Sequence, residues 1–181
     1  MLASPLPGEA PVSLNEARGW LRLGTSADDA VVAALVRAAT NICEAFVGQW
    51  LVVRAAEEVL APGSGPVTLG ARPVVAVDAV FALAQGGGET ALDADGWRLE
   101  VGRDGTGRVR IDDPGDAVRL RIAYRAGMAA GANAIPEAIR QGILRMTQHL
   151  HDARDGEGAA PPAAIAALWQ PWRRIGLGGG R

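Results

Sequence analysis

The sequence SADDAVVAALVRAATNICEAFVG, residues 26–48, decides the fold because it specifies one long helix with both of its ends. Its apolar residues recur at steps of three and four and so form one stripe of an α-helix: Val32, Leu35, Ala39, Ile42 and Phe46. Ser26 can cap the first turn, and Gly48 suits the left-handed position after the last turn. We expect a helix over residues 27–47 whose apolar stripe needs a partner.

That partner is expected at residues 136–153, far along the chain. Four apolar residues again share one helical stripe: Ile139, Ile143, Met146 and Leu150. Pro136 fits the first turn, and Ile135 before it is expected to be extended. A shorter helix, the first in the chain, is predicted over residues 13–23, where Ser13 and Glu16 have the spacing of a capping box, with an end near Gly24. The two long helices are expected to pack antiparallel.

Residues 51–125 have a different sequence pattern, with short runs of Val, Leu and Ile separated by Gly, Pro and Asp. Such runs predict β-strands joined by turns. In one of them Val118, Leu120 and Ile122 alternate with polar or small residues, so this strand should bury one face. The chain is therefore expected to be an α+β protein, with a mainly helical core and an antiparallel β insertion between helices two and three.

Composition excludes several classes of protein. The 181 residues include 49% hydrophobic and 21% charged residues, as in an ordinary globular domain, and the net charge of -2 does not favour a general binder of nucleic-acid phosphates. The single cysteine, Cys43, rules out an internal disulfide and indicates a small core residue. No signal peptide and no run of about 20 apolar residues is evident, so we expect synthesis in the cytoplasm and no membrane partner.

Candidate catalytic and metal-binding groups are few. His149 and His151 are two residues apart on a predicted helix, so they diverge rather than converge on an ion. Asp93 and Asp95 resemble the start of a calcium loop, but no glutamate closes it and a turn is the simpler interpretation. We expect no catalytic residues, no metal and no cofactor. A small hydrolase that uses His149 or His151 remains a remote alternative.

The C-terminal segment carries the residue types that dominate protein interfaces. After Pro161 and Pro162 a short helix is expected, which Pro171 interrupts or ends. The candidate partner-binding residues lie here: Trp169, Trp172, Arg173, Arg174 and Ile175. Trp169 could equally fold back into the core of the domain, an alternative that is weaker for Trp172. Two adjacent arginines are thin support for nucleic-acid binding.

The order of these segments resembles the head-tail connector, or adaptor, family of tailed phages and phage-like gene transfer agents. The resemblance runs from about Pro11 to Leu177 and rests on six segments in register: PVSLNEARGWLRL, EAFVGQWL, RPVVAVDAVFAL, VRLRIAYRAG, IPEAIRQGILRMTQHLHDARDG and LWQPWRRIGL. Gln49 departs from the family, which often has a basic residue at this position.

The resemblance implies a structural protein without catalytic activity. Such adaptors form a ring, usually of twelve copies, beneath the portal protein at the capsid vertex, and DNA passes through the centre without sequence-specific binding. The five C-terminal residues named above would then bind the portal, and the next tail component, a stopper or tail terminator, would bind the opposite side. The implied parts are an N-terminal arm (1–12), a connector domain (13–160) and a portal-docking tail (161–181), located finally in the particle neck. A stopper, tail-terminator or head-completion protein is the alternative.

Overall fold

The structure, a computed structural model, describes residues 2–3, 9–24, 29–153 and 160–174. The chain divides into two compact units. The β unit contains residues 1–8 and 53–128, and the helical unit contains residues 9–52 and 129–181. The predicted α+β fold with a β insertion is confirmed.

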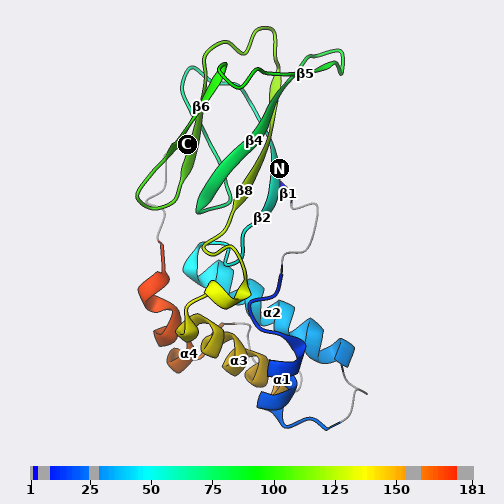
Figure 1. Cartoon of the computed structure of the whole chain (residues 1–181), viewed down its shortest axis with the longest axis vertical. Coiled ribbons are helices and arrows are strands. Elements are labelled where there is room, and N and C mark those ends of the chain that lie inside the picture. The colour runs from blue at the N-terminus through cyan, green and yellow to red at the C-terminus, as the bar shows by residue number, and fades with distance from the viewer. Residues whose placement is uncertain (1, 4–8, 25–28, 154–159, 175–181) are drawn as a thin grey trace. The chain divides into compact units, whose positions relative to one another are not determined.

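The helical unit is built from four α-helices and two short 3-10 turns within the described residues (Figure 1). Their bounds are α1 Leu14–Leu21, α2 Asp29–Val47, η2 Ala132–Ala134, α3 Glu137–Asp152, α4 Ala163–Trp169 and η3 Gln170–Trp172. Helix α3 packs against the other three, and α2 also contacts α1 and α4. The two long helices predicted from their apolar stripes are therefore packed together.

The buried stripe of α2 is rotated by about one residue from the predicted one. Its buried residues are Val32, Val36, Ala39, Cys43 and Val47. Leu35, Ile42 and Phe46 border this stripe and are half-buried. Cys43 is fully buried, and its burial raises the pKa of the thiol, as expected for a core cysteine. The expected Ser26 cap lies outside the described residues, whereas Gly48 has the predicted left-handed conformation, with φ of 69°.

Helix α1 begins with the predicted capping box. The Ser13 amide donates to Glu16 at 2.8 Å, and the Glu16 amide donates to the Ser13 hydroxyl at 3.2 Å. The helix ends earlier than predicted, because Arg22 and not Gly24 adopts the left-handed conformation, with φ of 56°. The amides of Arg22 and Leu23 donate to carbonyls of the last helical turn, at 3.3 Å to Gly19 and 3.1 Å to Arg18, which offsets the strain of a non-glycine residue there.

Arg140 on α3 binds to three other segments of the helical unit. Its guanidinium donates to the carbonyls of Pro11 at 2.9 Å and Ala132 at 3.2 Å, and it pairs with the carboxylate of Glu16. Glu16 is therefore shared between the α1 cap and the ion pair. The Ser13 hydrogen bonds, followed by the Arg140 charge, lower the pKa of Glu16.

The β unit contains two antiparallel sheets (Figure 1). Their strands are β1 Leu2–Ala3, β2 Arg54–Leu60, β3 Val67–Thr68, β4 Val74–Leu83, β5 Glu89–Ala91, β6 Trp97–Val101, β7 Gly107–Ile111 and β8 Arg119–Ala126. One sheet has the order β1-β2-β8-β4-β5, and the other has the order β3-β7-β6. The predicted start of this region was early, because Leu51 and Val52 belong to the helical unit.

Strand β8 is the centre of the larger sheet and shows the predicted alternation. Leu120, Ile122 and Tyr124 are buried, while Val118, just before the strand, is 47% exposed, contrary to the prediction. Tyr124 also donates its hydroxyl to Glu58, a buried carboxylate on β2, and accepts from the amide of Ala71 at 3.0 Å. Glu58 in turn accepts from the amide of Gly70 at 2.7 Å, so the two side chains fasten the segment before β4 to the sheet.

Helix α2 has a length and composition that would also suit a membrane span, which differs from the expectation that no segment approaches one. Core helices of globular proteins pass the same test of length and hydropathy. In α2 the buried stripe is covered by neighbouring helices of the same unit. We therefore describe it as a core helix.

Candidate interaction surface at the C-terminal segment

Trp169, at the last position of α4, lies in the core of the helical unit. Its side chain is fully buried, its indole Nε1 donates to the Ile139 carbonyl at 3.3 Å, and its ring centroid is 5.8 Å from that of Phe46. It also fits directly over Gly142 on α3, where a Cβ atom would lie 2.7 Å from Cε2 of the indole. The structure therefore corresponds to the core interpretation of Trp169, not to an exposed partner contact.

The three described residues after Pro171 lie on the surface of the same unit. Trp172 is half-buried, and Arg173 and Arg174 are exposed. The Arg173 guanidinium carbon lies 5.2 Å from the centroid of the Phe46 ring, within the range of a cation–π interaction. Ile175, the last of the predicted partner-binding residues, lies outside the described residues.

This segment is held against the C-terminal end of α2. The side-chain amide of Gln49 donates to the Trp172 carbonyl at 2.6 Å, and the Arg174 amide donates to the Val47 carbonyl at 2.8 Å. The sequence prediction named the tail residues but did not include Phe46 and Gln49, which contact them at the end of α2. The only available signal was that Gln49 differs from the basic residue common in the resembled family.

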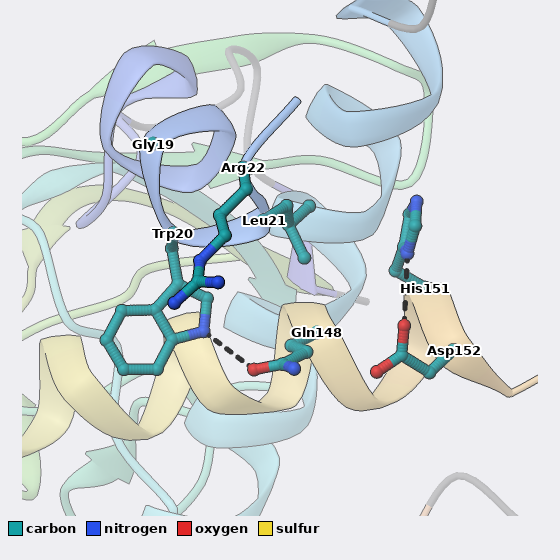
Figure 2. Close-up of a pocket in the computed structure, with 7 residues that line it drawn as sticks. All are labelled: Gly19, Trp20, Leu21, Arg22, Gln148, His151 and Asp152. Atoms are coloured by element: carbon teal, nitrogen blue, oxygen red, sulfur yellow. Dashed lines mark hydrogen bonds and ion pairs between the residues drawn. The ribbon is translucent and has the colours of Figure 1, made fainter. Parts of the chain in front are cut away.

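A concave surface lies elsewhere on the helical unit, between α1 and the end of α3. It has a volume of about 570 Å³ and is lined by Gly19, Trp20, Leu21, Arg22, Gln148, His151 and Asp152. Figure 2 shows the Trp20 indole beside Gln148, to which it donates a hydrogen bond of 2.9 Å. Trp20 is 39% exposed, so its ring is held in place while part of it stays accessible.

The chemistry of this concave surface gives the hydrolase alternative no support. His151 is exposed and lies 3.3 Å from Asp152, but none of the lining residues is a serine, threonine or cysteine that could act as a nucleophile. Among the described residues, no group of three or more His, Cys, Asp or Glu side chains could hold a metal ion. Asp93 belongs to a turn, in which its carbonyl accepts from the Gly96 amide at 3.0 Å.

Comparison with known proteins finds similar chains among solved structures of particles. The sequence matches no protein-family model and no curated protein. The fold, however, is similar to a chain from the neck of an empty gene transfer agent particle computed with sixfold symmetry. That chain has 28% identity and a TM-score of 0.78, over 100% of this chain and 99% of the other.

Two further solved structures give the same result. A chain from the virion of a native gene transfer agent particle has 28% identity and a TM-score of 0.76, over 99% of this chain and 98% of the other. A chain from a native neck computed with twelvefold symmetry has 25% identity and a TM-score of 0.75, over 100% and 99% of the two chains. These matches confirm the resemblance to the head-tail connectors of phage-like particles that the sequence indicated.

Proposed function

We propose that this chain is a structural, non-catalytic protein of the neck of a gene transfer agent or related phage-like particle, where it acts as a head-tail adaptor. The observation that carries the proposal is the match to chains of such particles over 99–100% of this chain and 98–99% of the others, which includes both units. A match over a single unit would support only a shared fold. Here the match includes both units.

Ring assembly is part of the proposal. Two of the similar chains come from necks computed with sixfold and twelvefold symmetry, which supports a closed ring, and we propose twelve copies. The β unit also has sheet edges at β5, β3 and β6 that no other described strand covers. A neighbour in a ring can cover such edges through a head-to-tail interface. DNA would pass through the ring without sequence-specific contacts.

The portal-docking surface that we propose is narrower than the one expected from the sequence. Trp172, Arg173 and Arg174, together with Ile175, would contact the portal protein, while Trp169 supports them from the core. Removal of the whole segment after Pro162 would also remove Trp169 from the helical core. Point substitutions at the surface are therefore the sharper test.

The test is binding of the purified chain to the portal protein of the same particle, with Arg173→Glu and Trp172→Ala as variants. We expect the wild-type chain to bind and both variants to bind less tightly, while their free energies of unfolding fall by no more than about 1 kcal/mol. Electron microscopy of the particle should place the chain in the neck directly under the portal. Binding to the tail tube alone would instead support the stopper or tail-terminator alternative, and absence from the neck would refute the proposal.

A further inference from the structure

The end of α2 and the C-terminal segment satisfy each other's polar groups. The last carbonyls of any α-helix have no partner within the helix. In α2 the Glu44 carbonyl accepts from the amides of Gly48 and Gln49, at 2.8 and 3.2 Å, and the Val47 carbonyl accepts from Arg174. The segment that follows α4 therefore completes the cap of α2. Arg173 and Arg174 also bring positive charge to the negative end of the helix dipole.

Gln49 fixes the position of the main chain at Trp172, two residues before Arg174. Its side chain is only 8% exposed, and its amide nitrogen reaches the Trp172 carbonyl at 2.6 Å. The left-handed conformation of Gly48 turns the chain at this point, so Gln49 is anchored by the helix end and not by a loop. Two hydrogen bonds thus hold residues 172 and 174 at a defined place on the helical unit.

A tilted pair of aromatic rings connects residues 172–174 to the core. The buried Trp169 ring packs at an interplanar angle of 53° against Phe46, and Phe46 in turn lies beneath the Arg173 guanidinium. The exposed Arg173 guanidinium therefore packs on the half-buried Phe46 ring, and Phe46 packs on the fully buried Trp169 ring. Trp172, which precedes Arg173 in the chain, is half-buried.

We infer that the docking surface is composite and preformed: Phe46 and Gln49 of the α2 end hold Trp172 and Arg173 in the arrangement that receives the partner. This inference rests on the proposed function, because it concerns the same portal-side surface. A guanidinium over an aromatic ring fits a partner segment with a carboxylate beside an apolar side chain. Gln49 is a positioning residue, since it acts through the main chain at Trp172.

Preformation matters because a surface that is ordered before binding loses less conformational freedom when the complex forms. Loss of the Gln49 hydrogen bond should free residues 172–174 without removing any side chain that contacts the partner. We expect the affinity for the portal protein to fall about five- to tenfold, as for loss of one net hydrogen bond.

The variants Gln49→Met and Gln49→Lys separate the hydrogen bond from side-chain size. Methionine has a similar shape but no donor, so portal binding should weaken and the Arg174 amide should exchange with solvent faster. Lysine keeps a donor and should restore both. The matched control is Gln148→Met, which removes the Trp20 hydrogen bond elsewhere on the helical unit and should leave portal affinity and Arg174 exchange unchanged.

The outcomes separate the two proposals. If the wild-type chain does not bind the portal protein, the proposed function fails, whereas hydrogen exchange at Arg174 still reports whether Gln49 holds the segment. If the wild type binds and Gln49→Met binds equally well, the inference is wrong. Should Gln49→Met fail to fold, Gln49→Lys decides the matter, because a folded lysine variant with weakened binding would contradict a role for the donor.

Discussion

The indole of Trp169 lies directly on Gly142, where the absence of a side chain on α3 leaves the space that the ring fills. A Cβ atom on residue 142 would lie 2.7 Å from Cε2 and 2.9 Å from Cδ1 of the indole, closer than real Cβ contacts allow. This one contact joins the penultimate described helix of the chain to α3 and explains why a glycine is present in the middle of a long helix.

Gly142→Ala should destabilise the helical unit, although the same change in an open helix position stabilises a protein by about 0.5–1 kcal/mol. The collision with the rigid indole should cost about 1–3 kcal/mol or more, as for other overpacked cores. Gly19→Ala on α1 is the matched control, because a Cβ there has nothing within 4 Å. Urea unfolding should show opposite signs for the two variants, and a stabilised Gly142→Ala would contradict this packing.

Trp169→Ala and Trp172→Ala should have very different effects on stability. Trp169 is fully buried, so its removal leaves a large cavity and should cost about 3–5 kcal/mol. Trp172 is half-buried and keeps its main-chain hydrogen bond from Gln49 in the variant, so the cost should be below about 1 kcal/mol. Equal destabilisation in urea would show that the two tryptophans share one environment.

Glu16→Gln should alter the acid stability of the protein. The folded-state pKa of Glu16 is lowered from its ordinary value of 4.5, so the ionised carboxylate stabilises the fold above pH 4.5. This contribution is lost as the pH falls from 4.5 through the folded-state pKa. Between pH 6 and pH 3 the wild type should lose more unfolding free energy than Glu16→Gln.

Glu137→Gln is the control for this experiment, because Glu137 also pairs with Arg140, at 3.7 Å, but is 73% exposed. Exposed ion pairs contribute little to stability, so this variant should unfold like the wild type. An identical acid profile for the wild type and Glu16→Gln would show that the cap and the ion pair do not favour the ionised form.

Tyr124→Phe should lower the free energy of unfolding of the β unit. It should also make this free energy less dependent on pH above pH 10. The variant leaves the Ala71 amide and the Glu58 carboxylate without the hydroxyl, which should cost about 1–3 kcal/mol at neutral pH. Burial, and then the hydrogen bond to Glu58, raises the pKa of Tyr124 above its ordinary value of 10.0. The stability that the neutral phenol provides is therefore complete below pH 10 and is lost as the pH rises above it.

Thermal unfolding between pH 8 and pH 11 would measure this difference. Cys43 also has a raised pKa, but it is present in both proteins, so its effect cancels when the wild type is compared with Tyr124→Phe. A gap between the two proteins that stays constant up to pH 11 would contradict the assignment.

Local signals in the sequence predicted the elements well. The capping box at Ser13, the left-handed Gly48 and the alternation along β8 each depend on neighbouring residues, and each is found in the structure. The rotation of the α2 stripe could not be predicted, because Val32 to Val47 is apolar on several sides and only the partner helices select which side is buried.

The candidate site depended on distant contacts and was predicted less well. Trp169 and Trp172 look alike in sequence, and only the space over Gly142 places the first in the core. The support that Gln49 gives to residue 172 joins positions 123 apart in the chain, and no local pattern encodes it. Likewise, Glu58 appears as an ordinary surface glutamate of a strand until Tyr124 and Gly70 enclose it.

The position of Trp169 also affects the order of events during synthesis. Residues 53–128 leave the ribosome well before Trp169, so most of the β unit can form while the helical unit still lacks one of its core residues. A chain that stops short of α4 would expose the apolar faces of α2 and α3 that the indole covers. A chain that ends before α4 should therefore aggregate and be cleaved by proteases more readily than the full-length chain.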